Sequence, residues 1–164
     1  ENFHTGEEVN AYITAELPVP PVEPVKPLPN SAAFENMEYK SAMTEYEEKM
    51  VRWKKLNDLV VRHMIHGPCG IDNPKAPCCG EKGGEKCAKH YPKDYSSETY
   101  LGLTNHIYPT YRRRKKEDGG TTFINNGREI DNRWVVSYSP YLLLKYECHI
   151  NVEACLSVRG VKYL

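Results

Sequence analysis

The sequence predicts an α+β protein, in which an antiparallel sheet is flanked by helices and carries a Cys-rich insertion and an N-terminal helical arm. Three observations favour this fold class. Helical periodicity fills most of the first 66 residues, a stretch dense in Gly, Pro and Cys follows, and segments of strand composition occupy the last third. The chain has 164 residues, and a domain of about 150 residues buries roughly 70% of its unfolded surface, which is enough for a core.

The first element is a predicted helix within residues 1–17. Thr5 can accept a hydrogen bond from the amide of Glu8, and the Glu8 carboxylate can reach back to the amide of Thr5, which is the pattern of a capping box. An apolar stripe at helical spacing follows, formed by Val9, Tyr12, Ile13 and Leu17. We expect the helix to end near Glu16, because prolines begin directly afterwards.

A proline-rich linker is predicted for residues 18–30. Its prolines are Pro18, Pro20, Pro21, Pro24, Pro27 and Pro29. Each proline lacks an amide donor and restricts the residue before it, so a regular helix cannot form here. We therefore expect an extended connector close to polyproline II.

A long charged helical segment is predicted for residues 31–66, which contain no Pro or Gly. Its apolar positions are widely spaced: Phe34, Met37, Tyr46, Met50, Trp53, Val60 and Met64. Glutamates precede basic residues at a spacing that allows i,i+4 ion pairs, as in Glu45 and Lys49. The pattern is typical of one long helix or two consecutive helices with a buried stripe and a solvated face. A helix that binds a partner is the alternative.

The charge is divided unequally along the chain, although the formal net charge is zero. Residues 1–68 carry 7 basic and 11 acidic side chains, whereas residues 69–164 carry 15 basic and 11 acidic ones. All 6 cysteines lie in the second part. A polyanionic partner is therefore expected to meet the second part. No apolar run approaches the roughly 18 residues of a membrane span, so no membrane partner is expected.

Residues 67–164 form the predicted Cys-rich and strand-rich domain. Strand composition occurs at residues 133–139 and 146–155, and residues 140–145 between them can turn or form a short helix. Trp134, Val135 and Val136 are predicted core residues. Cys148 and Cys155 are interpreted as small core residues rather than ligands.

The cysteine spacing indicates a metal site. Cys69, Cys78 and Cys87 follow the pattern C-x8-C-x8-C, with His66 three residues before the first cysteine and His90 three after the last. Structural Zn²⁺ prefers four thiolate and imidazole ligands, and a loop with few apolar side chains gains folding energy from such an ion. The predicted zinc-knuckle-like set is His66, Cys69, Cys78 and Cys87, with His90 or Cys79 as substitutes for one member. Reduced thiols without metal, or disulfides in a secreted chain, are the alternatives.

A basic run indicates contact with nucleic acid. Its predicted DNA-binding residues are Tyr111, Arg112, Arg113, Arg114, Lys115 and Lys116, with Arg133 further along the chain. Lys and Arg neutralise phosphates, and aromatic rings stack on unpaired bases, which suits single-stranded or junction DNA. The alternative is an exposed, solvated turn that ends at residues 117–120.

Many residues in one order resemble the segment that follows the nuclease motif of Helitron transposases. The matching blocks are Tyr12-Ile13-x-Ala15-Glu16-Leu17-Pro18, Met64-Ile65-His66-Gly67-Pro68-Cys69-Gly70, Asn73-Pro74, Pro77-Cys78, Cys87-x-Lys89, Pro92-Lys93, Thr99, Tyr111-Arg112-Arg113-Arg114, Asp131-Asn132-Arg133-Trp134-Val135-Val136, Tyr138, Pro140, Leu142, His149-Ile150-Asn151-Val152-Glu153 and Lys162-Tyr163-Leu164. The resemblance is dense over residues 56–164, whereas residues 19–55 look like an insertion.

The resemblance implies part of a rolling-circle endonuclease fold of the HUH (Rep) class, truncated at its C-terminus. Such enzymes hold Mg²⁺ or Mn²⁺ with a His-hydrophobic-His pair and attack DNA with tyrosine. Tyr163 matches the first tyrosine of the family motif and is the candidate nucleophile. The chain has no His-hydrophobic-His pair, so the resemblance places the metal-binding pair before Glu1. It also has no phosphate-binding helicase loop, so the helicase is expected in the parent protein.

The segment around His149 contains weak candidates for further metal ligands. If residues 146–155 form a strand, His149, Asn151 and Glu153 share one face. His149 and Glu153 are weak candidates for ligands of the catalytic metal, and a polar strand face with ordinary hydrogen bonds is the alternative.

The leading hypothesis is therefore a fragment of a Helitron-type transposase that binds single-stranded DNA, with metal-dependent nicking and joining through tyrosine in the intact protein. The fragment alone is expected to be inactive, because it lacks the metal-binding histidines. Two alternatives remain: an inactive, zinc-bearing DNA-binding module of a decayed element, and an interaction domain that uses the helix of residues 31–66. A nuclear location follows by analogy.

Overall fold

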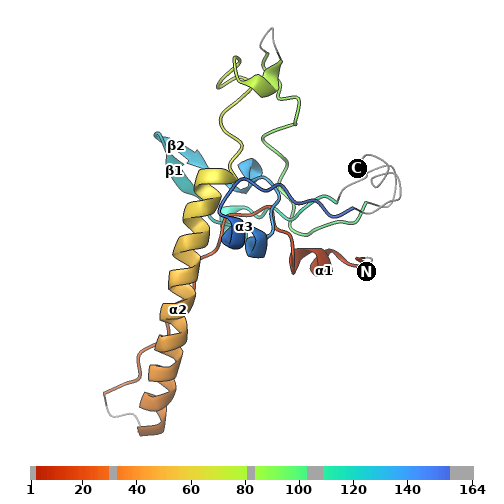
Figure 1. Ribbon diagram of the computed structural model, residues 1–164. Coiled ribbons are helices and arrows are strands. Elements are labelled where there is room, and N and C mark those ends of the chain that lie inside the picture. The colour runs from red at the N-terminus through yellow and green to blue at the C-terminus, as the bar shows by residue number, and fades with distance from the viewer. Residues whose placement is uncertain (1–2, 30–32, 81–83, 103–108, 156–164) are drawn as a thin grey trace.

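The computed structural model describes residues 3–29, 33–80, 84–102 and 109–155. Its elements are α1 (Gly6–Asn10), α2 (Ala33–His63), β1 (Phe123–Asn125), β2 (Arg128–Ile130) and α3 (Pro140–Tyr146), with 3-10 turns η1 (Pro77–Cys79), η2 (Lys116–Asp118) and η3 (Asn132–Trp134). The structure is mixed: one long helix, a two-stranded antiparallel sheet and extended segments (Figure 1).

Helix α1 begins as the sequence predicts but ends early. The capping box is confirmed, since the Glu8 amide donates to Thr5 Oγ1 over 3.2 Å and the Thr5 amide donates to Glu8 Oε2 over 3.3 Å. The helix ends at Asn10 rather than near Glu16. The reason is a backbone pairing, in which the Thr14 amide donates to the Tyr138 carbonyl over 2.9 Å and forces the chain to extend.

The linker and the long helix form an arm that extends from the rest of the protein (Figure 1). Within residues 18–29 the structure contains neither helix nor strand, as the prolines predict. Helix α2 is a single helix, and the predicted ion pair of Glu45 and Lys49 is present at 2.6 Å. Only its last turns enter the core, through Leu59, Val60 and the following Met64.

The predicted sheet is much smaller than expected. Residues 133–139 and 146–155 are not strands of a sheet, which corrects the prediction from composition. The extended segment from Trp134 to Tyr138 instead serves several partners in turn: the His66 amide donates to the Trp134 carbonyl, the Val136 amide to the Met64 carbonyl, and the Tyr138 amide to the Thr14 carbonyl. No pairing extends into a regular β-ladder, because successive residues of this segment hydrogen-bond to different parts of the chain.

The observed sheet is a hairpin that the sequence reasoning missed. Strands β1 and β2 pair antiparallel, with Phe123 opposite Ile130. Asn126 and Gly127 connect them at φ values of 50° and 77°. Two consecutive residues with positive φ are the mark of a type I′ turn, for which Asn-Gly is the favoured pair. That dipeptide was the available signal.

Three buried clusters make up the core of the part of the chain that the structure describes. The largest joins α2, the 134–138 segment and α3, and contains Leu17, Leu59, Val60, Met64, Val135, Tyr138 and Leu143. A second is centred on Val9 and Tyr111, and a third packs Trp134 against two cysteines. Of the turn and the short helix that the sequence allowed for residues 140–145, the structure has the helix, α3. Cys148 and Cys155 are exposed and not in the core, which corrects their predicted role.

Candidate metal centre

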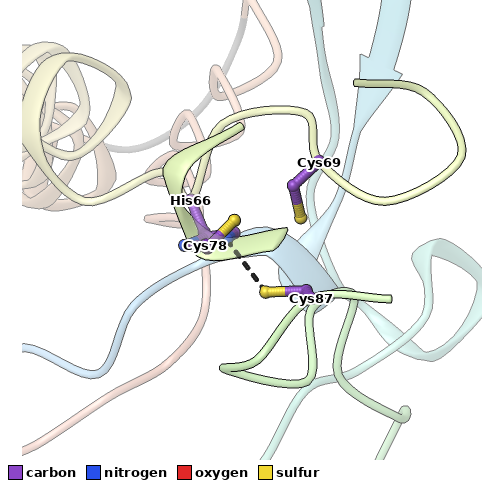
Figure 2. A group of neighbouring side chains, drawn as sticks. All are labelled: His66, Cys69, Cys78 and Cys87. Carbon is purple, nitrogen blue, oxygen red and sulfur yellow. Dashed lines mark hydrogen bonds between the residues drawn. The ribbon is translucent and has the colours of Figure 1, made fainter. Parts of the chain in front are cut away.

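Four predicted zinc ligands lie together in the Cys-rich loop. The imidazole of His66 and the thiols of Cys69, Cys78 and Cys87 each offer one ligand atom, and these atoms all lie within 4.8 Å of one another (Figure 2). His66 Nε2 is 3.4 Å from Cys87 Sγ. Tetrahedral zinc with bonds of about 2.0–2.3 Å separates its ligand atoms by about 3.3–3.8 Å. The group is therefore suitable for a structural zinc, with small inward shifts of the longer pairs.

The backbone brings the four ligands together from three directions. His66 follows the end of α2, and its backbone amide donates a hydrogen bond to the Trp134 carbonyl over 2.8 Å. Cys78 belongs to η1, and its carbonyl accepts from the Ala88 amide over 2.8 Å, directly after Cys87. This contact fixes the second and third cysteines relative to each other.

Gly70 makes the turn at the first cysteine possible. Its φ of +65° lies in the left-handed region, and a Cβ at this position would stand 2.6 Å from the Glu85 carbonyl oxygen. Glycine is therefore required both for the backbone conformation and for the close passage of the returning chain. That passage carries the loop toward Cys87.

The structure also decides between the alternative ligands. Cys79, the neighbour of Cys78, is outside the group, and its Sγ accepts from the Gly70 amide at 3.1 Å. His90 is exposed and is not part of the group either. Cys79 thus supports the turn that carries Cys69 and is not itself a ligand, as expected for one member of an adjacent pair.

The surroundings set the protonation of the ligands. Burial raises the pKa of the Cys69 thiol to about 12, and burial also raises the pKa of Cys78. Burial acts in the same direction on Cys87, but the amides of Tyr91 and Lys89 stabilise its thiolate more strongly and lower its pKa. The Lys89 amide lies 3.3 Å from Cys87 Sγ. The two amides therefore favour the thiolate of Cys87, which is the form that binds a metal.

Tyr91 and the lysines near it act on the imidazole. The ring of Tyr91 stacks on His66, with 4.1 Å between centroids and 13° between planes. Burial lowers the pKa of His66, and the positive charges of Lys89 and Lys93 lower it further. His66 is consequently neutral at pH 7, which is the form that binds metal.

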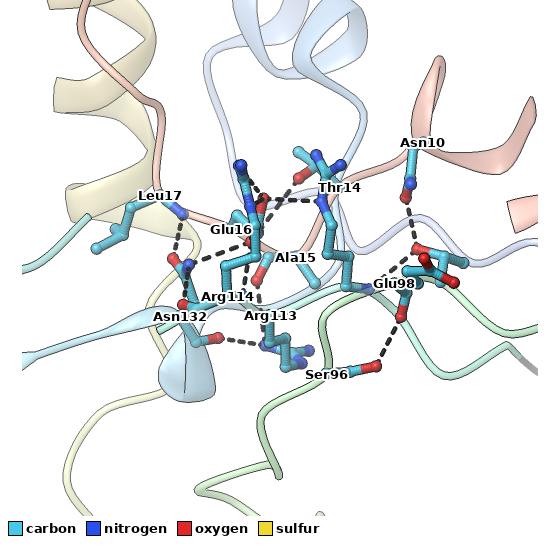
Figure 3. A network of polar contacts seen from close by, with 12 residues as sticks. Asn10, Thr14, Ala15, Glu16, Leu17, Ser96, Glu98, Arg113, Arg114 and Asn132 are labelled. Carbon is cyan, nitrogen blue, oxygen red and sulfur yellow. Dashed lines mark hydrogen bonds and ion pairs between the residues drawn. The ribbon is translucent and has the colours of Figure 1, made fainter. Parts of the chain in front are cut away.

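A buried polar network lies at the centre of the fold (Figure 3). The Glu16 carboxylate accepts from Arg114 at its amide, over 2.7 Å, and at Nη2, over 2.8 Å. The side chain of Asn132 accepts from the Leu17 amide over 2.8 Å and donates to the Arg114 carbonyl over 2.9 Å. Residues from three segments far apart in the sequence therefore meet in one network.

The basic run is only partly exposed. Tyr111 and Arg113 are buried, whereas Arg112 and Arg114 point to Glu16, because side chains alternate along an extended segment. Arg113 Nη1 donates to the carbonyls of Ala15, Asn132 and Val135 at 3.2, 2.6 and 2.7 Å. Tyr111 and Arg113 are thus engaged inside the fold, contrary to the interpretation of the whole run as a DNA contact.

Lys115, Lys116 and Arg133 remain at the surface. Lys115 Nζ lies 5.6 Å, and the guanidinium of Arg133 4.7 Å, from the centroid of the Tyr95 ring. Tyr95 itself donates from its hydroxyl to Asp131 over 3.1 Å. The sequence reasoning missed Tyr95, which lies far from the basic run in the chain. We call Tyr95, Lys115, Lys116 and Arg133 the cationic surface: Lys115 and Lys116 are exposed, whereas Arg133 also pairs with the Asp131 carboxylate over 2.8 Å.

A pocket of about 430 Å³ lies beside the candidate metal centre. Its lining includes Lys89, Tyr91, Lys93, Arg113 and Glu153. Tyr91 belongs to both places, since its ring also stacks on His66. The pocket therefore offers Lys89 and Lys93 next to the Cys-rich loop, whereas the guanidinium of Arg113 is already bound by carbonyls of the fold.

The segment around His149 does not form the predicted strand. His149 Nδ1 lies 2.6 Å from the His63 carbonyl oxygen. Asn151 and Glu153 instead accept from Ser137 Oγ, over 2.9 and 2.6 Å. Within the described ranges, His66, Cys69, Cys78 and Cys87 are the one group of at least three His, Cys, Asp or Glu side chains close enough to share an ion. His149 and Glu153 do not come together as ligands. Tyr163 lies outside the described residues.

Neither a protein-family model nor a curated protein matches this chain. Among the helices of the described residues, none has the length and apolar character needed to span a membrane.

Proposed function

We propose that this chain is a zinc-stabilised, single-stranded DNA-binding segment of a Helitron-type rolling-circle transposase with part of the HUH (Rep) fold. The observation that carries the proposal is the meeting of the resembling blocks: Glu16, Arg114 and Asn132 come from three separate blocks and bond to one another. Residues that match a family in order and also act together in space support the resemblance more strongly than the order alone.

The zinc part of the proposal rests on the chemistry of the donor set. Three thiols and one imidazole are soft ligands that suit Zn²⁺, and a closed set of four is typical of structural sites. When bound, the ion would cross-link His66 at the end of α2 to Cys69, Cys78 and Cys87 in the loop. The pocket residues Lys89, Tyr91 and Lys93 follow Cys87 within six positions, so a fixed loop also fixes them.

The DNA part rests on charge at the surface. The cationic surface offers Lys115, Lys116 and Arg133 beside Tyr95, and phosphates bind such groups with release of counterions. The pocket adds Lys89 and Lys93 on the side of the metal centre. Sequence recognition is not required for this mode of binding, because charge and stacking serve any single strand.

Salt-dependent binding tests the proposed function. Each phosphate contact of a single strand contributes about −0.7 to the slope of log K against log salt. With the zinc-loaded chain and a fluorescent single-stranded oligonucleotide, Lys115→Gln with Lys116→Gln should reduce the slope by about 1.4. The matched control is Lys40→Gln with Lys54→Gln on the exposed side of α2, which changes the net charge equally and should leave the slope unchanged. Equal effects of the two double variants would refute the assigned surface.

Cleavage by the chain alone is not part of the proposal. Tyrosine has an ordinary pKa of about 10 and needs help from a metal to attack a phosphodiester. Incubation with a labelled single strand and Mg²⁺ or Mn²⁺ should give no covalent adduct on denaturing gels. An adduct at Tyr163 would show that the missing histidines are not needed.

A further inference from the structure

The arm has an internal repeat of three residues, which becomes visible in its burial. In residues 18–29, every third residue is half-buried and the two between are exposed: Pro18, Pro21, Pro24 and Pro27 are the half-buried ones. A period of three is that of a polyproline II helix. The proline row packs toward α2, where Pro24 and Pro27 line a shallow pocket with Glu38 and Tyr39.

A second row of the same helix is aliphatic and exposed. Its members follow the prolines by one position: Val19, Val22, Val25 and Leu28 are 51, 90, 91 and 80% exposed. Helix α2 adds Met37 and Val51, which are 71 and 70% exposed. Fourteen residues separate these two, close to four helical turns, so they lie on one side of α2. An apolar row of this length on a soluble protein marks an interaction surface.

The charges of α2 indicate what covers it. Residues 33–48 carry five acidic side chains and one basic one, a formal charge of −4. Residues 49–63 carry five basic side chains and one acidic one, a formal charge of +4. Two such helices side by side repel when parallel and attract when antiparallel, because each acidic half then faces a basic half. This arrangement is the self-complementary one that twofold symmetry produces.

We propose that the arm, made of residues 18–29 and α2, is a self-association surface on which the arm of a second copy lies antiparallel. The aliphatic row and the exposed apolar side chains of α2 supply the buried contact, and the two charged halves set the orientation. The proposal is independent of DNA binding, since the cationic surface belongs to the other part of the chain.

A charge-swap experiment tests whether the charges of α2 hold the two copies together. Variant A carries Glu45→Lys, Glu47→Lys and Glu48→Lys, which makes the first half +2 and leaves the second at +4; variant B carries Lys49→Glu, Arg52→Glu and Lys54→Glu, which leaves the halves at −4 and −2. Sedimentation equilibrium should show a dimer for the natural chain, monomers for A and for B alone, and a heterodimer for their mixture. Circular dichroism checks that α2 remains helical in both variants.

The aliphatic row is tested separately. Val22→Ser with Val25→Ser should raise the dimer dissociation constant by more than about tenfold, because buried aliphatic contact is lost. The matched control is Ile71→Ser with Ile124→Ser, which removes two side chains of similar exposure outside the arm and should leave the constant unchanged. A natural chain that stays monomeric at every concentration, or a dimer that survives in A, in B and in the serine variant, would overturn the proposal.

Discussion

Two polar clusters of this protein lie close together in the chain's fold and have opposite characters. In the buried network, the Glu16 carboxylate and the Arg113 guanidinium find their partners within the described chain. In the metal centre, Cys69, Cys78 and Cys87 converge on one another and on one imidazole. Buried polar groups that satisfy one another's hydrogen bonds stabilise a fold. Thiols and an imidazole that point at one another are instead suited to bind a metal ion.

Replacing one cysteine of the candidate metal centre should reduce stability more than any other change considered. Structural zinc contributes about 10–16 kcal/mol of apparent binding free energy in small zinc-dependent folds. Cys87→Ser should therefore lower the stability of the zinc-loaded chain by more than about 3 kcal/mol, or roughly 10 °C in Tm. Scanning calorimetry with one equivalent of Zn²⁺ measures the change, and a chelator should lower the Tm of the natural chain in the same way.

The neighbouring cysteines provide a matched control. Cys79→Ser alters a thiol beside Cys78 that accepts from the Gly70 amide and donates to the Asn73 carbonyl, and a serine hydroxyl can also accept and donate. It should retain full zinc stoichiometry and most of the Tm, and with Co²⁺ it should keep the thiolate charge-transfer band that Cys87→Ser weakens. If both variants lose metal equally, the ligand set is wrong.

The second effect concerns the network. Glu16→Gln keeps the shape of the side chain but leaves Arg114 without its counter-ion, and a hydrogen bond to a charged group contributes about 1.5–3 kcal/mol. Since Arg112 and Arg114 are about one-third exposed, water compensates part of the loss, and we expect about 2 kcal/mol in urea unfolding. Glu147→Gln, which breaks an exposed ion pair with Lys55, should cost much less, because water solvates both charges.

The same carboxylate gives a pH dependence of known sign. Burial raises the pKa of Glu16, but hydrogen bonds from Arg114 and the charges of Arg114 and Arg112 outweigh it and lower the pKa below its ordinary value. The unfolded chain therefore binds the proton more readily. The contribution of Glu16 is complete above the ordinary pKa of about 4.3 and disappears as the pH falls through the folded pKa.

Comparison of the natural chain with Glu16→Gln isolates this contribution, since both chains lose zinc alike in acid. The difference in free energy of unfolding should be constant from pH 7 to about pH 5 and should shrink below about pH 4. A difference that grows in acid would mean that burial dominates over the arginines.

The sequence predicted which His and Cys side chains come together better than it predicted the network, for a physical reason. The equal spacing of the cysteines and His66 limited the ligands to a few combinations, and geometry was needed only to exclude Cys79 and His90. In the basic run the sequence shows consecutive charges, but the burial of Arg113 depends on alternation along an extended segment and on carbonyls from residues far away. Composition also overestimated the sheet, because one extended segment serves several short partners.

The smallest change in stability is expected at the hairpin. Its Ile130 packs in one buried cluster with Trp134, Cys69 and Cys87, so the hairpin borders the candidate metal centre. Gly127 adopts a φ of +77° with open space around its Cα, so Gly127→Ala is strained by its backbone alone and should cost about 1–2 kcal/mol. Gly67→Ala also meets open space and has no positive φ, so it should change stability by less than about 0.5 kcal/mol. Because the strain is local to the turn, Gly127→Ala should lower the Tm without changing zinc affinity. A loss of zinc affinity would mean that the hairpin positions the ligands through Trp134, and the metal centre would then depend on the core as the network does.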